Sequence, residues 1–212
     1  MLGPLPPQTN YQVAFERGLE RARGQRPEVL AALGAERTAD GSYRLRVLDA
    51  TFAVDLDRAA ITLAGDEQPA AEAANVGLAW QILALHYLSA SPPPPGPARW
   101  LSFADFQDAR GYTPVYRGRV LHRLCGTVGR DRETFAAACH QLGGQPMDWA
   151  DESFRFEVFP RLPLVVTWYY GDDEFPPNAS FLYRDDVLTF VPLEDVIVLS
   201  EALVGRLRGK GW

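Results

Sequence analysis

The stretch LVVTWYY, from Leu164 to Tyr170, has β-branched or aromatic side chains at six of its seven positions. Such side chains favour strands, and a run that is apolar on both faces is typical of a strand in the centre of a sheet. The segment 154–158 alternates Phe or Val with Arg and Glu, which predicts a strand with one face in the core. Segments 181–183 and 187–191 predict two more strands of this block.

A second block of strands is expected nearer the N-terminal end. Three short segments there alternate apolar and polar residues, and the gaps between them suit tight turns. They predict a three-stranded antiparallel meander over 43–47, 52–56 and 61–63. The apolar face of a meander needs a cover, and the apolar segment from about Glu72 to Ala90 predicts a buried helix in that role.

The remaining periodic segments predict helices at 11–23, 27–33, 115–125, 132–142 and from Pro192 to about Gly209. Because strands come in blocks and do not alternate with helices, the expected fold class is α+β, with antiparallel sheets in two strand blocks packed with helices. The proline-rich spacer 91–97 is the best candidate for an internal boundary. We therefore expect one compact domain over 1–212, with 11–90 and 98–209 as its two lobes if the spacer divides it.

The composition is that of a globular protein. Hydrophobic residues make up 47% and charged residues 23% of the 212 residues, and the net charge is −6. Diffuse acidity disfavours binding to nucleic acid or to anionic membranes, and no apolar run reaches the ~18 residues that a membrane span needs. The first ten residues do not have the pattern of a signal peptide, and two cysteines without such a signal suggest reduced thiols. We expect a cytoplasmic protein.

The sequence contains no phosphate-binding glycine loop, nucleophile elbow, paired CxxC or zinc-protease helix motif. No catalytic residue and no metal ligand is therefore assigned, and the cofactor is unknown. The most pointed feature is the loop Gly171–Pro177, which follows the central strand and carries three consecutive carboxylates, those of Asp172, Asp173 and Glu174. This loop is a solvated turn, a contact for a ligand or partner, a site for a hard cation such as Mg²⁺, or the seat of a general base.

Aromatic residues surround the acidic loop, and they either pack in the core or line a pocket for a flat ligand. From the aromatic and acidic residues together we expect a ligand- or partner-binding site. Its candidate residues are Arg161, Trp168, Tyr170, Asp172, Asp173 and Glu174, with Arg161 holding an anionic group.

Histidines and cysteines form a second set of candidates, for a zinc or haem site that uses three of four residues. His122 and Cys125 lie three residues apart on one expected helix, and Cys139 and His140 are adjacent on the next. Neighbours on a helix point about 100° apart, which disfavours a shared metal ion for Cys139 and His140. His86 lies in an apolar helix, where it is a core residue bonded to a backbone carbonyl, an axial haem ligand or a general base.

Several strings together resemble a known domain family. They are QILALHYL (81–88), WLSF (100–103), LGG (142–144), FPRLP (159–163) and GDDEFPP (171–177). The chain resembles, from about Tyr11 to Leu207, a bacterial and archaeal domain family of unknown function, common in anaerobes, whose members are sometimes fused to a small iron–sulfur cluster module. The resemblance implies a link to redox or cofactor metabolism, through an iron–sulfur protein as partner, and it carries over no catalytic residue.

Three hypotheses of function follow. The first is a non-catalytic binding module for a small ligand, a cofactor or a protein partner. The second is an enzyme that uses the loop 172–174 as general base or Mg²⁺ site. The third is a haem or corrinoid carrier that uses His86 or His140.

Overall fold

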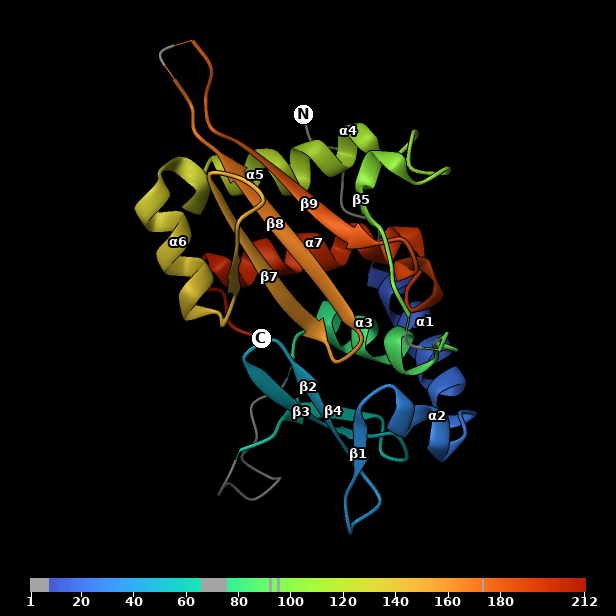
Figure 1. Cartoon of the computed structure of the whole chain (residues 1–212). Coiled ribbons are helices and arrows are strands. Elements are labelled where there is room, and N and C mark those ends of the chain that lie inside the picture. The colour runs from blue at the N-terminus through green and yellow to red at the C-terminus, as the bar shows by residue number, and fades with distance from the viewer. Residues whose placement is uncertain (1–7, 66–75, 92, 95, 173) are drawn as a thin grey trace. The chain divides into compact units, whose positions relative to one another are not determined.

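A computed structural model describes residues 8–65, 76–91, 93–94, 96–172 and 174–212. The chain divides into two compact units, which are described separately (Figure 1). Unit 1 consists of residues 1–46, 50–92 and 212, and unit 2 consists of residues 47–49 and 93–211. Two parts of the predictions lie outside the described residues. They are residues 72–75, where the helix expected from Glu72 to Ala90 would begin, and Asp173 of the acidic loop.

Unit 2 is built on a five-stranded antiparallel sheet. Its strands are β5 (Trp100–Ser102), β6 (Gln145–Met147), β7 (Glu152–Phe159), β8 (Leu162–Tyr169) and β9 (Asn178–Arg184), in the order β5-β9-β8-β7-β6. The strand expected from the LVVTWYY run is therefore the central one, and every residue of β8 before Tyr169 is buried. The two edge strands have only three residues each and were not expected from the sequence.

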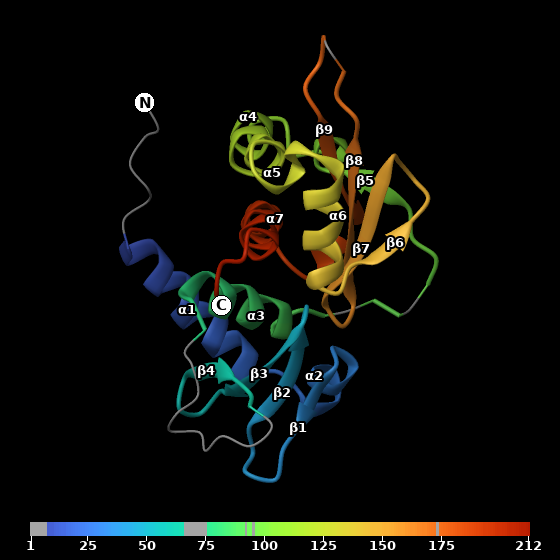
Figure 2. The ribbon, with the colours of Figure 1, turned by 90° about the vertical axis from the view of Figure 1, so that its left-hand side faces the viewer.

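The helices of unit 2 lie on one face of this sheet (Figure 2). A continuous helical segment runs through α4 (Thr113–Tyr116), the π-helical turn η2 (Arg117–Leu121) and α5 (His122–Cys125). It is followed by the short η3 (Val128–Arg130), by α6 (Arg132–Gln141) and finally by α7 (Leu193–Leu207). Phe135 of α6 packs against Phe154 of β7 and stacks on Trp168 of β8, so this face of the sheet forms the core of the unit.

The prediction of a strand over 187–191 is wrong. Val187–Thr189 forms a 3₁₀ turn, η4, that comes before α7. Val187, Phe190 and Val191 are buried and Leu188 is exposed, so the buried positions are spaced by three and four residues, as in a helix. A strand at 187–191 could not form a hairpin with β9, the strand before it, because β9 already pairs with β8 on one side and with β5 on the other.

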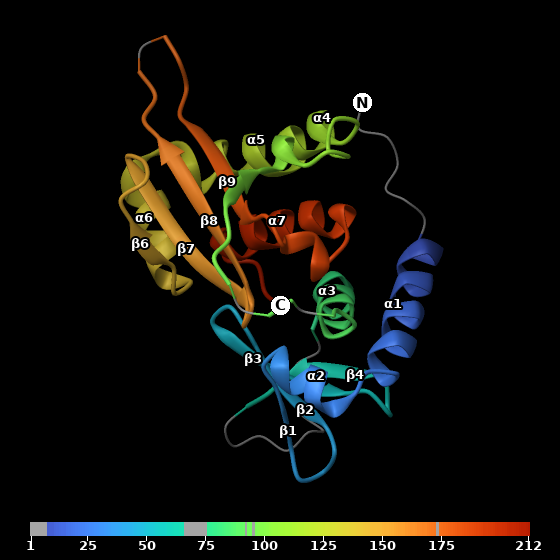
Figure 3. The same ribbon diagram turned by 45° about the vertical axis from the view of Figure 1, so that its right-hand side comes forward.

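In the residues that the structure describes, unit 1 is a four-stranded antiparallel sheet with three helices (Figure 3). The strands are β1 (Ala35–Arg37), β2 (Tyr43–Val47), β3 (Ala50–Asp55) and β4 (Ala60–Leu63), in sequential order, so the expected meander has one additional short strand, β1. The helices are α1 (Gln8–Arg23), α2 (Pro27–Ala32) and α3 (Leu78–Leu88). Helix α3 is buried almost all round, as its composition predicts.

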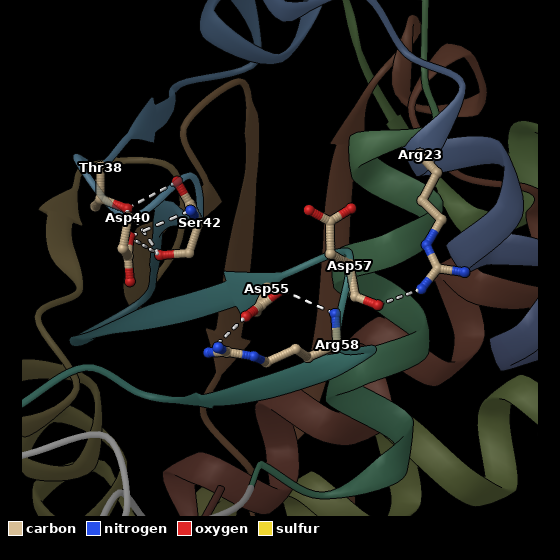
Figure 4. Close-up of polar contacts among 7 residues, drawn as sticks. All are labelled: Arg23, Thr38, Asp40, Ser42, Asp55, Asp57 and Arg58. Atoms are coloured by element: carbon tan, nitrogen blue, oxygen red, sulfur yellow. Dashed lines mark hydrogen bonds and ion pairs between the residues drawn. The ribbon is translucent and has the colours of Figure 1, made fainter.

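Side chains close the turns of unit 1 (Figure 4). In the β1–β2 hairpin the carboxylate of Asp40 accepts hydrogen bonds from Thr38 and Ser42, which lower the pKa of that carboxyl group. In the β3–β4 hairpin, Asp55 accepts from the backbone amide of Arg58 and pairs with its guanidinium group. The bonds of Asp55 are local in sequence, which explains why the turn at 57–58 could be predicted. The β1–β2 turn was not predicted, because β1 was not expected.

The architecture is α+β, as predicted, with two antiparallel sheets packed with helices. Within the part of the chain that the structure describes, no helix is both long and apolar enough to cross a membrane.

Candidate functional site

The hairpin between β8 and β9 extends beyond the sheet of unit 2 (Figures 1 and 3). We call residues 170–177 the arm. Its base is narrow: a Cβ atom on Gly171 would lie 2.6 Å from the backbone nitrogen of Pro177 and 2.7 Å from the carbonyl oxygen of Phe175. The amide of Asp172 donates to that same carbonyl at 2.8 Å. Only glycine therefore fits at position 171 unless the two sides of the arm separate.

The carboxylate of Asp172 is part of the arm's own structure. Its Oδ1 atom accepts hydrogen bonds from the backbone amides of Glu174, at 2.9 Å, and of Phe175, at 2.7 Å. This arrangement is a side-chain-closed turn of the kind that Asp commonly makes. Glu174 is exposed. The acidic loop thus contains a structural aspartate and a solvated glutamate, and Asp173 is outside the described residues.

A pocket of about 620 Å³ lies between the arm and the end of α5. We call it the arm pocket. One wall comes from the helical segment and the other from the arm and the start of β9. Its lining residues are Leu121, His122, Cys125, Gly126, Tyr170, Phe175, Pro176, Pro177 and Asn178. The lining is largely apolar, with an imidazole, a thiol, a phenol and an amide as its polar side chains.

The helical wall of the pocket follows a π-helical turn. Leu121 is the last residue of η2 and His122 is the first of α5. Such turns are rare and occur often at functional sites, because the extra residue changes the direction of the side chains that follow. His122 is exposed and Cys125 is partly buried. Burial raises the pKa of the Cys125 thiol, so this group is held in its neutral form.

The arm wall is anchored through Tyr170. Its backbone amide donates to the carboxylate of Asp151 at 2.8 Å. Its ring meets the ring of Trp168 edge to face, with 5.1 Å between centroids. The guanidinium group of Arg132 pairs with Glu152 and also interacts with Tyr170. Both partners raise the pKa of Arg132, and Glu152 has the larger effect. Contacts from three sides therefore hold this residue, although 54% of its surface is exposed.

Trp168, a candidate from the sequence, lies underneath the site and does not line it. It is 1% exposed, and its indole Nε1 donates to the carbonyl oxygen of Gly129 at 2.8 Å. Phe135 stacks on one side of the indole at 6.0 Å. Trp168 therefore supports Tyr170 from the core, whereas Tyr170 and Phe175 are the aromatic residues that line the pocket.

Arg161 is not brought to the site. It lies in the turn between β7 and β8, at the opposite end of β8 from Tyr170, and β8 has eight residues. At about 3.4 Å per residue the two ends of such a strand are more than 20 Å apart. The guanidinium group of Arg161 donates to the carbonyl oxygen of Pro93 at 2.5 Å and lies over the Phe190 ring at 5.6 Å.

The structure separates the histidines and cysteines. His122 and Cys125 line the arm pocket, whereas Cys139 is fully buried in α6 and His140 meets the Phe154 ring edge to face. Burial, and secondarily the charge of Glu152, raise the pKa of the Cys139 thiol far above its usual range. His86 belongs to α3 of unit 1, where it packs against Gly18 of α1. Among the described residues, no group of three or more His, Cys, Asp or Glu side chains is arranged to hold a metal ion.

The lining residues that sequence reasoning did not connect are those of the helical wall. His122 and Cys125 were singled out by their spacing of three residues, but only as ligands of a metal ion. Gly126 and Tyr170 are 44 positions apart in the chain, and no local pattern indicates that the two segments meet. The signal that the sequence does contain is the pair of prolines after Phe175: proline is disfavoured inside a strand, so the pair marks where the arm ends and β9 begins.

Comparison with known proteins yields a family but no characterised relative. A family model described as "Domain of unknown function (DUF3786)" matches residues 26–206, which is most of the chain. No curated protein and no solved structure matches the chain significantly.

Proposed function

We propose that this chain, which belongs to the DUF3786 family, is a binding module that holds a small molecule in the arm pocket. The observation that carries the proposal is the pocket itself. Its volume of about 620 Å³ lies within the range of small-molecule sites, roughly 300–1,000 Å³. Its lining has the composition of such sites, in which apolar and aromatic walls surround a few polar groups.

The chemistry of the lining supports binding without catalysis. The nucleophile available there is the Cys125 thiol, and burial disfavours its reactive thiolate form. The Asp172 carboxylate already accepts two backbone amides, and neither Asp172 nor Glu174 is a lining residue. Within the described lining, a general base for a bound molecule would have to come from His122, and no carboxylate there orients that imidazole.

The test is native mass spectrometry of the full chain purified without a tag from its own host. We expect a bound molecule in the wild type, and we expect its loss in Cys125→Phe, which fills the pocket. Val115→Phe is the matched control, since Val115 lies in the same helical segment, is 47% exposed and does not line the pocket. Recovery of the same molecule from Cys125→Phe as from the wild type contradicts the proposal.

Two further expectations stay proposals. We propose a reducing, cytoplasmic location, which is supported by the free thiols of Cys125 and Cys139. We also propose that a link to redox or cofactor metabolism runs through an iron–sulfur protein partner. Co-purification of a cluster-bearing protein with the tagged chain, detected by its visible absorbance and its iron content, is the measurement that checks the partner.

A further inference from the structure

We infer that the arm pocket is built for a flat, uncharged, aromatic or heteroaromatic ring. This inference rests on the proposed function and names the class of ligand. It follows from three features of the pocket: the shape of its apolar surfaces, the charges that are kept away from it, and its size.

The arm presents flat surfaces to the pocket. Tyr170 and Phe175 are 54% and 66% exposed, and they are among the most exposed large apolar side chains of the described residues. Pro176 and Pro177 extend this surface with two rigid rings. Rings prefer to pack against rings in stacked or edge-to-face geometry, and aromatic pairs gain about 0.5–1.5 kcal/mol beyond the burial of area. A planar ligand covers these four rings with more contact than a branched or spherical molecule of equal volume.

The surfaces are also fixed before a ligand binds. Tyr170 is held by Asp151, by Trp168 and by Arg132, and Gly171 keeps the base of the arm narrow. Side chains that are already immobilised lose little conformational entropy on binding. The Tyr170 ring is therefore prepared for a partner ring, which distinguishes it from a single apolar residue scattered on a surface.

The charged side chains that the structure describes near the pocket do not line it. Three carboxylates that the fold places near the arm wall are already engaged: Asp151 with the Tyr170 amide, Asp172 with two arm amides, and Glu152 with Arg132. Glu174, on the arm itself, is exposed and does not line the pocket. Among the described residues, no Asp, Glu, Lys or Arg lines the pocket. A cationic ligand finds no carboxylate among these lining residues, and an anionic ligand finds no guanidinium group, so they would leave either buried charge uncompensated.

The polar side chains suit the edge of a heteroaromatic ring. His122 and Asn178 each offer both donor and acceptor atoms, and they come from the opposite walls of the pocket. A pocket of about 620 Å³ has room for a system of two or three fused rings.

The experiment uses three probes of different shape and charge with the full chain. Lumichrome is a neutral, planar tricycle; proflavine is a planar cation; 1-adamantanol is a neutral, compact cage. Dissociation constants are measured by isothermal titration calorimetry, and the site is located by ¹H–¹⁵N shift changes of Gly126 and Asn178. We expect lumichrome to bind at least tenfold more tightly than either other probe, and to shift both amides.

Variants locate the binding energy. We expect Phe175→Ala and Tyr170→Ala each to weaken lumichrome binding tenfold or more, whereas Trp149→Ala, which removes an exposed aromatic that does not line the pocket, changes it less than twofold. Equal or tighter binding of proflavine or 1-adamantanol overturns the inference about ligand class. Equal effects of Trp149→Ala and Phe175→Ala overturn the location. If no planar probe binds while a native molecule is lost from Cys125→Phe, the ligand class is wrong and the binding function stands.

Discussion

The buried hydroxyl chain in unit 2 allows a sharp prediction of stability. The hydroxyl of Tyr183 lies 2.9 Å from that of Tyr116 and 2.5 Å from Ser200 Oγ, and Ser200 Oγ donates to the carbonyl oxygen of Val196 at 2.7 Å. Each hydroxyl has one proton. Because the proton of Ser200 is used for Val196, Tyr183 must donate to Ser200, and Tyr116 must donate to Tyr183. The three protons make three directed bonds.

This direction makes the two tyrosines unequal. In Tyr116→Phe one bond is lost, and Tyr183 keeps its acceptor Ser200, so we expect a loss of about 1 kcal/mol of unfolding free energy. In Tyr183→Phe two bonds are lost, and the buried hydroxyl of Tyr116 is left with a proton and no acceptor. The cost of an unsatisfied buried group is about 1–3 kcal/mol in addition to a net bond, so we expect a loss of about 2–4 kcal/mol. The double variant removes the orphaned donor and should cost no more than Tyr183→Phe.

The assay is urea unfolding of the single and double variants, with a double-mutant cycle calculated from the four free energies. Tyr169→Phe is the control, since Tyr169 is on the same sheet and 43% exposed, and it should stay within about 0.5 kcal/mol of the wild type. Equal costs for Tyr116→Phe and Tyr183→Phe, or strictly additive costs in the double variant, would refute the directed chain.

The other predictions concern a thiol, two glycines and the arm. The raised pKa of Cys139 means that its neutral thiol is favoured in the fold. Its contribution is therefore complete below about pH 8.5, and unfolding free energy falls as pH rises beyond it, by up to about 1.4 kcal/mol per pH unit for this thiol. Urea titrations from pH 7 to 10 should show this slope; Cys139→Ala should make it shallower, and the part that remains is expected from Cys125, whose pKa burial also raises. Gly144→Ala places a Cβ atom 2.8 Å from the Phe156 ring and 2.9 Å from a carbonyl oxygen, and should cost about 1–3 kcal/mol. At Gly118 an added Cβ atom meets open space and the neighbours are helical, so Gly118→Ala should raise the unfolding free energy by up to about 1 kcal/mol. Thermal unfolding of both glycine variants measures these changes. Asp172→Ala removes the acceptor of two arm amides; hydrogen exchange should accelerate at 174 and 175 while global unfolding free energy stays within about 0.5 kcal/mol, and unchanged exchange would contradict the structural role of this carboxylate.

Local patterns determined most of the elements. The LVVTWYY run predicts the central strand because a strand covered on both faces needs apolar residues at every position, and that requirement is met within eight residues of chain. Helix ends could be predicted for the same reason: Pro27 begins α2, and Gly34 follows it with a positive φ of 82°. The α+β class follows from the order of these elements, which is a property of the sequence.

Tertiary structure decided the edges of the sheets and the site. The edge strands β1, β5 and β6 have three residues each, too few for a pattern, and they exist because a neighbouring strand offers unpaired amides and carbonyls. Segment 187–191 has the composition of a strand but becomes a turn, because β5 already occupies the edge that it would need.

The candidate site shows the same division. The sequence pointed to the arm by its glycine, carboxylates and prolines, and it could not show that Asp172 closes a turn, that Trp168 is buried beneath Tyr170, or that Arg161 lies at the far end of β8. These facts depend on contacts between residues far apart in the chain. The arm pocket exists only because folding brings the end of α5 against the arm, and such a long-range contact leaves no periodic signal in either segment.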